Sequence, residues 1–178
     1  MTSNDKKYFR ILAVSPSRWG FGFVVLEGTN VLVDWDAKVT TKEKNPWCLK
    51  EVDKLIHRYG PDAIVLYDYS SGSKRSARIR RVNKSLIVLA RGHKIKVESF
   101  TPEKVARIFF ADATGTKHDV ATALATQFPD ELGFRLPPKR TAWMNQDRRM
   151  DIFDAAALAV APRLLEKARL NAVKISEC

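Results

Sequence analysis

The fold is decided early in the chain, in residues 9–36, which read FRILAVSPSRWGFGFVVLEGTNVLVDWD. Phe9–Val14 is a short and nearly continuous apolar run, which is typical of a strand buried on both faces. Gly20–Leu26 and Asn30–Asp36 follow as two further strand patterns, and Glu27-Gly28 between them predicts a hairpin turn. These patterns together predict three consecutive antiparallel strands at the start of the domain.

Beyond residue 36, predicted strands alternate with predicted helices. Strand patterns lie at residues 63–67 and 94–99, and helical patterns lie at residues 46–59, 74–91, from 102 onward, at 117–128 and from about 151. Pro162 is expected to limit or kink the last helix. Three antiparallel strands followed by this alternation predict an α/β fold, a mixed five-stranded sheet with helices on both faces.

Length and composition favour one domain over residues 1–178, with a basic, Pro-rich loop at residues 129–150. The two cysteines, Cys48 and Cys178, form neither a disulfide framework nor a zinc pattern, which favours a reducing, bacterial-type cytoplasm or nucleoid. No apolar run approaches the ~20 residues that span a bilayer, and the first residues lack the apolar core of a signal peptide. We therefore expect no membrane association.

The chain carries a net charge of +11, and its cations are concentrated. Residues 72–97 hold nine Lys or Arg and no acid, and a second basic cluster spans residues 135–149. This favours a polyphosphate partner, because a solvated helix face usually mixes signs and a membrane-binding face would also be apolar. The cations expected to contact nucleic acid are Lys74, Arg75, Arg78, Arg81, Lys84, Lys139, Arg140, Arg148 and Arg149. Trp143 either stacks on an unpaired base or packs over apolar surface.

Two aspartates open the alanine-rich segment RRMDIFDAAALAVA at residues 148–161. Asp151 and Asp154 share one face of the predicted helix, with their β-carbons about 5–6 Å apart. Two carboxylates this close repel each other unless a cation, a proton or solvent separates them, so the pair suggests a divalent metal site. The alternative is ordinary capping of the first helical turn. His57, His93 and His118 are scattered along the sequence, and they predict no histidine-based site.

Residues 10–161 resemble the RuvC family of Holliday-junction resolvases, within the ribonuclease H-like superfamily. Four stretches in the family order carry the resemblance: ILAVSPSRWGFGFVVLEG, PDAIVLYDYSS, SFTPEKVARIFFADATGTKHDVATAL and DIFDAAALAVA. The resemblance implies a function in DNA recombination and repair, with branched or junction DNA as the partner. It also implies phosphodiester hydrolysis by two Mg²⁺ or Mn²⁺ ions held by four carboxylates, and a homodimer that packs through residues 74–91.

Carried over by position, the resemblance assigns the catalytic and metal-binding roles to Asp68, Asp151 and Asp154, with Asp68 in place of a family glutamate. The family's first-strand aspartate falls on Ser15. A serine hydroxyl is neutral and bridges two cations poorly, so we expect ordinary two-metal cleavage to be impaired or absent. Lys117 matches a family lysine that would meet phosphate, although an exposed lysine in a first helical turn is an equally good interpretation.

Two functions of different classes therefore stay open. The first is a catalytically degenerate, structure-selective DNA-binding protein, which the serine at position 15 favours. The second is an active Mg²⁺- or Mn²⁺-dependent crossover-junction endodeoxyribonuclease with an atypical site, which the three retained acids favour. An RNA-processing nuclease of the same superfamily is a further alternative.

Overall fold

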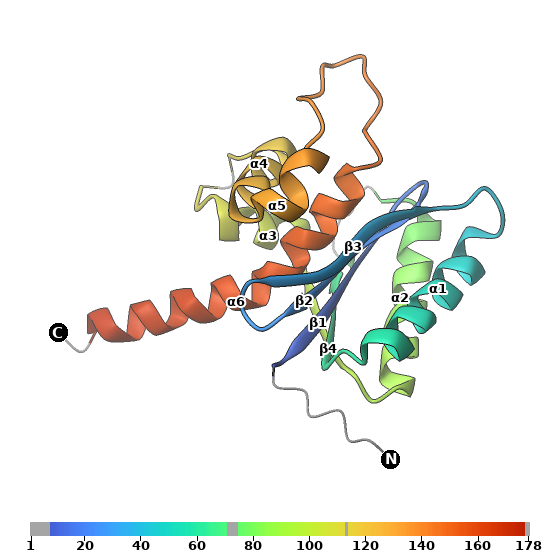
Figure 1. Ribbon diagram of the computed structural model, residues 1–178, viewed down its shortest axis with the longest axis horizontal. Coiled ribbons are helices and arrows are strands. Elements are labelled where there is room, and N and C mark those ends of the chain that lie inside the picture. The colour runs from blue at the N-terminus through green and yellow to red at the C-terminus, as the bar shows by residue number, and fades with distance from the viewer. Residues whose placement is uncertain (1–7, 71–74, 113, 177–178) are drawn as a thin grey trace.

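The computed structural model describes residues 8–70, 75–112 and 114–176, and Figure 1 shows a central sheet flanked by helices. In chain order the elements are β1 Arg10–Pro16, β2 Gly20–Glu27, β3 Val31–Val39, α1 Lys44–Tyr59, β4 Ala63–Tyr67, α2 Ala77–Gly92, β5 Lys96–Phe100, α3 Pro102–Phe109, α4 Lys117–Gln127, α5 Pro129–Leu132, the 3₁₀ turn η1 Gly133–Arg135, and α6 Met150–Ser176. Among the helices of the described residues, none is long and apolar enough to cross a membrane.

The strands form one five-stranded sheet in the order β3-β2-β1-β4-β5. β1 pairs antiparallel with β2, and β2 pairs antiparallel with β3, whereas β4 runs parallel to both β1 and β5. Gly28, with φ 63°, lies in the turn between β2 and β3, where a left-handed backbone favours glycine. The predicted mixed sheet, with three antiparallel strands followed by two parallel ones, is confirmed.

Each face of the sheet has its own hydrophobic cluster, and β1 contributes to both because successive side chains of a strand alternate between faces. Leu12 and Val14 pack with α1 and α2, while Ile11 and Ala13 pack with α6. The same alternation places Ser15 on the α6 face. α2 is the helix that the resemblance assigns to dimer packing, and its apolar side chains Ile79, Val82 and Leu86 are buried in these clusters.

α6 is buried from Met150 to Ala161, where its small alanines let it lie close against β1 and β2. Beyond Pro162 the helix continues to Ser176, extending away from the rest of the chain (Figure 1). Pro162 therefore does not end the helix. It removes one N–H donor, but Leu164 and Leu165 in the next turn still pack against the core.

The loop before α6 is shorter than the sequence predicts. Residues 129–135 form α5 and η1, because Pro129 suits the first position of a helix and Leu132 is buried. The irregular segment is residues 136–149, which we call the basic loop.

Candidate functional site

The acid pair lies where the first turn of α6 meets the end of β1. Asp151 and Asp154 are 4% and 8% exposed, and they line a cavity of about 80 Å³ together with Ser17, Arg18 and Arg75. Ser15 pairs with Gly22 in the β1–β2 ladder, and Gly22 abuts the backbone of Asp151. The structure therefore brings the predicted pair close to the position of the missing aspartate.

Asp68 does not join this pair. It lines a different cavity with Arg80, Asn83 and Lys84 of α2, on the opposite face of the sheet. Its Oδ1 accepts a 2.8 Å hydrogen bond from the backbone N–H of Ser70, and hydrogen bonding from Ser70 holds the pKa of Asp68 below its ordinary value. The structure thus does not assemble the three acids into one site, because a one-residue step along a strand reverses the face.

A tyrosine occupies the place beside Ser15 that an acid would need. In the β1–β4 register Ala13 pairs with Val65. Ser15 and Tyr67 lie two residues further along these parallel strands, and therefore next to each other on the same face. The Tyr67 hydroxyl lies 3.5 Å from the backbone oxygen of Asp154, and its ring stacks on Tyr69 with centroids 5.7 Å apart. This end of β4 contributes phenol groups to the α6 face.

Lys117 forms an ion pair with the carboxylate of Asp154. Its Nζ lies 2.7 Å from Asp154 Oδ2, and the Asp154 side chain is 10% exposed. Lys117 is the first residue of α4, where the Thr116–Asp119 capping box fixes the start of the helix. The lysine that the resemblance assigns to phosphate therefore neutralises one of the two buried acids.

Burial, together with the negative charge of Asp154, raises the pKa of Asp151 to about 6. The Ser17 hydroxyl, Lys117 and Arg75 act in the opposite direction. Asp151 Oδ2 is buried without a hydrogen-bond partner among the described residues. The Asp151 carboxylate is therefore poorly compensated in this fold.

These residues do not fit a pair of divalent cations. Two Mg²⁺ ions call for several carboxylate oxygens, and each wants near-octahedral oxygen coordination. The α6 face offers two carboxylates, one of them held by Lys117, and Arg75 lines the same cavity. Among the described residues, the group of three or more His, Cys, Asp or Glu whose ligand atoms lie within 4.8 Å of one another is found elsewhere. It consists of Asp53, His57 and His93.

Asp151→Asn is expected to stabilise the protein at pH 8, by about 1–3 kcal/mol, since the pKa is raised by roughly two units. The raised pKa means that the folded state favours the neutral acid. The contribution of Asp151 to the free energy of unfolding is therefore fully present below the unfolded pKa of 3.8, and it is lost as pH rises through about 6. The amide escapes this loss, so the gain should vanish near pH 4 in urea unfolding.

The matched control is Asp154→Asn, which removes the ion pair with Lys117 and should not stabilise at either pH. A loss of stability in Asp151→Asn at pH 8 would contradict the poorly compensated carboxylate.

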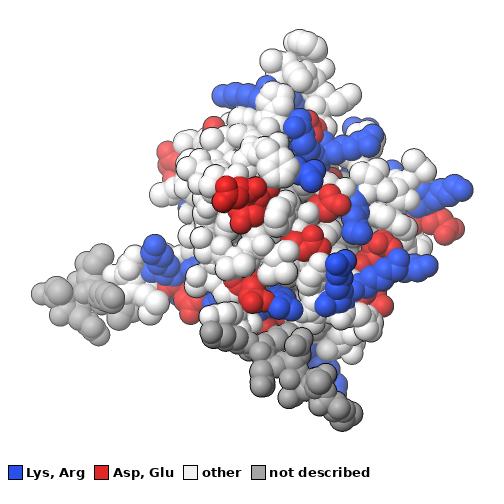
Figure 2. All heavy atoms as spheres, viewed as in Figure 1, with Lys and Arg blue, Asp and Glu red and all other residues white. Residues whose placement is uncertain are grey.

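The predicted nucleic-acid contacts fall into two groups. Four are engaged within the protein: Lys117 with Asp154, Arg149 with Asp147 at 2.7 Å, Arg78 with the backbone oxygen of Ser17 at 2.6 Å, and Arg140, itself exposed, with the backbone oxygen of Met144. The other exposed cations are Arg81, Lys84, Lys139 and Arg148, and Arg75 is partly buried. Lys74 lies outside the described residues. Figure 2 shows Lys and Arg side chains around the basic loop at the top of the view.

Two contributors were not singled out from the sequence. Trp19 contacts two guanidinium groups, that of Arg18 at 4.5 Å and that of Arg148 at 4.7 Å from its ring centroid. Arg18 and Trp19 both line the cavity of the acid pair. The only sequence signal was their place in the short β1–β2 turn, three and four residues after Ser15.

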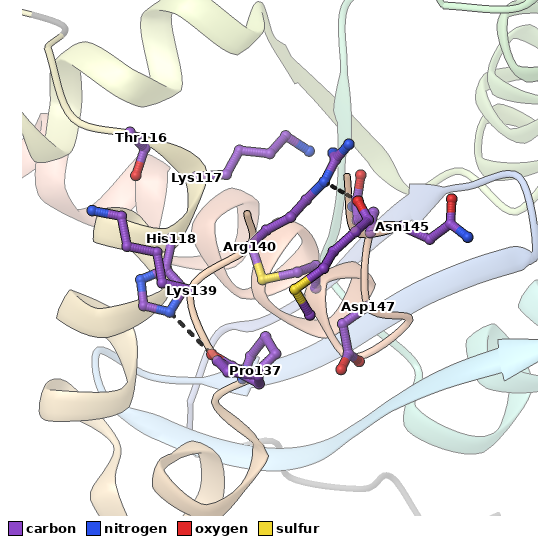
Figure 3. A pocket seen from close by; sticks show the side chains of 12 residues that line it. Thr116, Lys117, His118, Pro137, Lys139, Arg140, Asn145 and Asp147 are labelled. Atoms are coloured by element: carbon purple, nitrogen blue, oxygen red, sulfur yellow. Dashed lines mark hydrogen bonds between the residues drawn. The ribbon is translucent and has the colours of Figure 1, made fainter. Parts of the chain in front are cut away.

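A larger cavity of about 310 Å³ lies between α4 and the basic loop. Figure 3 shows cationic and polar side chains from both elements around it, among them Lys117, His118, Lys139 and Arg140. His118 Nε2 bonds the backbone oxygen of Pro137 at 3.0 Å and ties the loop to α4. Trp143, in the same loop, is 86% exposed, so it does not pack over apolar surface.

No protein-family model matches this sequence, and no curated protein matches it. Solved structures do match. The RuvC structure of Thermus thermophilus superposes with a TM-score of 0.66 and 16% identity, over 90% of this chain and 96% of that chain. The same protein in complex with a Holliday junction substrate gives 0.64, with the same identity and coverage.

The yeast mitochondrial Holliday junction resolvase Ydc2 superposes with a TM-score of 0.61 and 12% identity, over 94% of this chain and 86% of that chain. At such identities a structural likeness shows the fold alone. The chain has the RuvC-like, ribonuclease H-like fold.

Proposed function

On the premise of this shared fold, we propose that the protein binds branched DNA, such as a four-way junction, and does not cut it by two-metal hydrolysis. The observation that carries the proposal lies in the two cavities that share Arg75 and Asp154, which together we call the cleft. Ser15 and Tyr67 stand where acids would face the pair, and Lys117 holds Asp154 at 2.7 Å.

The charge balance explains why the cleft should reject a divalent pair. Asp151 and Asp154 supply two negative charges at most, and Lys117 and Arg75 supply two positive charges beside them. A bridging carboxylate would have to lie between two dications, and the neutral Ser15 hydroxyl cannot replace its charge. The cleft thus has no excess negative charge to attract Mg²⁺ or Mn²⁺.

The same charges favour phosphate. The basic loop presents Lys139, Arg140 and Arg148 to solvent, beside the large cavity and near the acid pair. Lysines and arginines of this kind hold backbone phosphates, and an exposed tryptophan stacks on an unpaired base. Trp143 therefore suits a junction, where bases at the crossing point are less constrained than in duplex. Two of the three structural neighbours described above are named for Holliday junctions.

The alternative of an active endonuclease rests on one observation, the retained Asp151–Asp154 pair at the end of β1. A homodimer and a cytoplasmic location stay predictions from the resemblance and the composition.

The binding proposal is tested by fluorescence anisotropy with a labelled four-way DNA junction, the matching duplex and an RNA four-way junction. We expect tighter binding to the DNA junction, with log affinity falling against log salt by about 0.9 per phosphate neutralised. Removing two loop charges, in Lys139→Gln with Arg148→Gln, should lower the slope by about two and weaken binding roughly 10–100-fold.

The matched control removes the same charge from the exposed second half of α6, in Lys167→Gln with Arg169→Gln. It should leave the slope unchanged. Equal losses in both double variants, equal affinity for junction and duplex, or no binding at low salt would overturn the proposal. Tighter binding to the RNA junction would move the proposal to RNA.

A further inference from the structure

Three ligand-bearing side chains meet far from the acid pair, at the ends of the two helices that cover the other face of the sheet. Asp53 and His57 lie one turn apart near the end of α1, and His93 caps the end of α2. His93 Nε2 is 2.7 Å from Asp53 Oδ1, and His57 Nδ1 is 3.5 Å from Asp53 Oδ2. The two imidazole rings meet edge to face with centroids 5.1 Å apart.

We propose that Asp53, His57 and His93 bind one first-row transition-metal ion, with Zn²⁺ the best fit and water completing its coordination. This inference does not rest on the proposed DNA binding, since the cluster lies on α1 and α2 and shares no residue with the cleft.

The donor set selects the class of metal. Imidazole nitrogens suit Zn²⁺, Ni²⁺ and Cu²⁺, whereas Mg²⁺ and Ca²⁺ prefer oxygen ligands throughout. Two histidines and one carboxylate, with an open fourth position, form a known type of tetrahedral zinc coordination. The cluster therefore differs in chemistry from the oxygen-only site that the resemblance implies for the cleft.

The spacing is close to what such an ion requires. With metal–ligand bonds of about 2.0–2.2 Å, tetrahedral geometry separates ligand atoms by roughly 3.3 Å. Asp53 Oδ1 lies 2.7 Å from His93 Nε2, and one ligand atom from each of the three residues lies within 4.8 Å of the others. A small opening of the Asp53–His93 contact and a turn of the His57 ring that presents Nε2 therefore suffice. As the ion takes its place in that contact, the Nε2 proton of the neutral His93 ring is exchanged through solvent for one on Nδ1, so the ring stays neutral when it binds the metal.

The surroundings orient the ligands and leave them accessible. His57 Nδ1 lies 2.8 Å from the backbone oxygen of Asp53. A carbonyl can only accept, so this nitrogen carries the proton of the neutral ring and Nε2 keeps a lone pair; metal-binding histidines are commonly oriented in this way. The side chains of His93, Asp53 and His57 are 29%, 39% and 67% exposed, so an ion reaches them from solvent.

The ion would join α1 to α2. These helices pack on one face of the sheet through the cluster that contains Val52, Leu55, Val82 and Leu86. Ligands from two separate helices come together only in the folded chain, so the binding free energy stabilises the fold. The expected role is a structural clamp at the helix ends.

The experiment titrates tag-free protein, first stripped with a chelator, with ZnCl₂ in a calorimeter and with CoCl₂ in an absorption spectrometer. We expect one ion per chain, visible d–d bands for Co²⁺, and a rise in melting temperature of roughly 5 °C at an excess of about 100-fold over the Kd. His57→Gln and His93→Gln should each weaken binding at least about 10-fold.

Two controls separate the possible outcomes. His118→Gln removes the third histidine, outside the cluster, and should bind Zn²⁺ like the unmodified chain. The Asp151→Asn, Asp154→Asn double variant should also bind it unchanged. Because His57 is exposed, His57→Gln should keep its circular dichroism, so lost binding is not lost folding. The absence of an ion, unchanged binding in the His57→Gln, His93→Gln double variant, or loss of binding in the cleft double variant would overturn the proposal.

Discussion

Gly22→Ala is expected to leave little or no folded protein. An added β-carbon would lie 1.9 Å from the backbone oxygen of Asp151 and 2.3 Å from its carbonyl carbon. Neither atom can rotate away, because both belong to the first turn of a helix that is buried from Met150 to Ala161. The strand or the helix must therefore shift, at a cost on the order of 4 kcal/mol or more, against a total stability of about 5–15 kcal/mol.

The matched control is Gly92→Ala at the end of α2, where an added β-carbon meets nothing within 4 Å. In a helix this change should be neutral or stabilise by up to about 1 kcal/mol. Urea unfolding followed by circular dichroism compares the two variants. A Gly22→Ala protein that unfolds at the same midpoint as Gly92→Ala would show that α6 does not sit against β2 as described.

Much of this architecture could be predicted from the sequence because the strands carry strong local signals. The continuous apolar run of β1 and the three closely spaced strand patterns predicted the three antiparallel strands. The alanine-rich stretch after Asp154 indicated a helix. Residues 129–135 were missed as helical because four residues of α5 are too few to establish a period.

The candidate site was predicted less well, because it depends on which face of a strand a residue occupies. Asp68 follows β4 directly, but Val65 and Tyr67 are the residues that alternate toward α6. The contact between Lys117 and Asp154 joins residues 37 positions apart, and Asp53 and His93 are 40 positions apart. No pattern within a single element carries such information, so only the folded chain reveals these pairs.

Cleavage of a four-way junction by this protein is expected to equal the rate in buffer, with either Mg²⁺ or Mn²⁺. A working metal site supplies a rate enhancement on the order of 10⁶ or more. That enhancement requires carboxylates that hold the ions, and here Lys117 engages Asp154 while Asp151 is buried with a pKa near 6. Asp154→Asn should therefore leave the cleavage rate unchanged, since the carboxylate it removes holds no metal.

The retained acids keep a structural explanation under this account. Asp154 anchors Lys117 and so ties the start of α4 to α6. Asp151 accepts a hydrogen bond from the Ser17 hydroxyl in the β1–β2 turn. The backbone oxygen of Ser17 in turn accepts a hydrogen bond from Arg78 of α2. Both acids thus connect the elements that converge at the end of β1, and neither needs a cation for that role.

The most direct test incubates an end-labelled four-way DNA junction with the unmodified protein, once in Mg²⁺ and once in Mn²⁺. The protein is present at roughly 10-fold excess over the DNA and above its Kd, so that most of the junction is bound. Native and denaturing gels of the same samples report binding and cleavage together. We predict that the junction is bound and stays intact. Paired nicks made by the unmodified protein, and lost in Asp154→Asn, would contradict it and establish an active endonuclease.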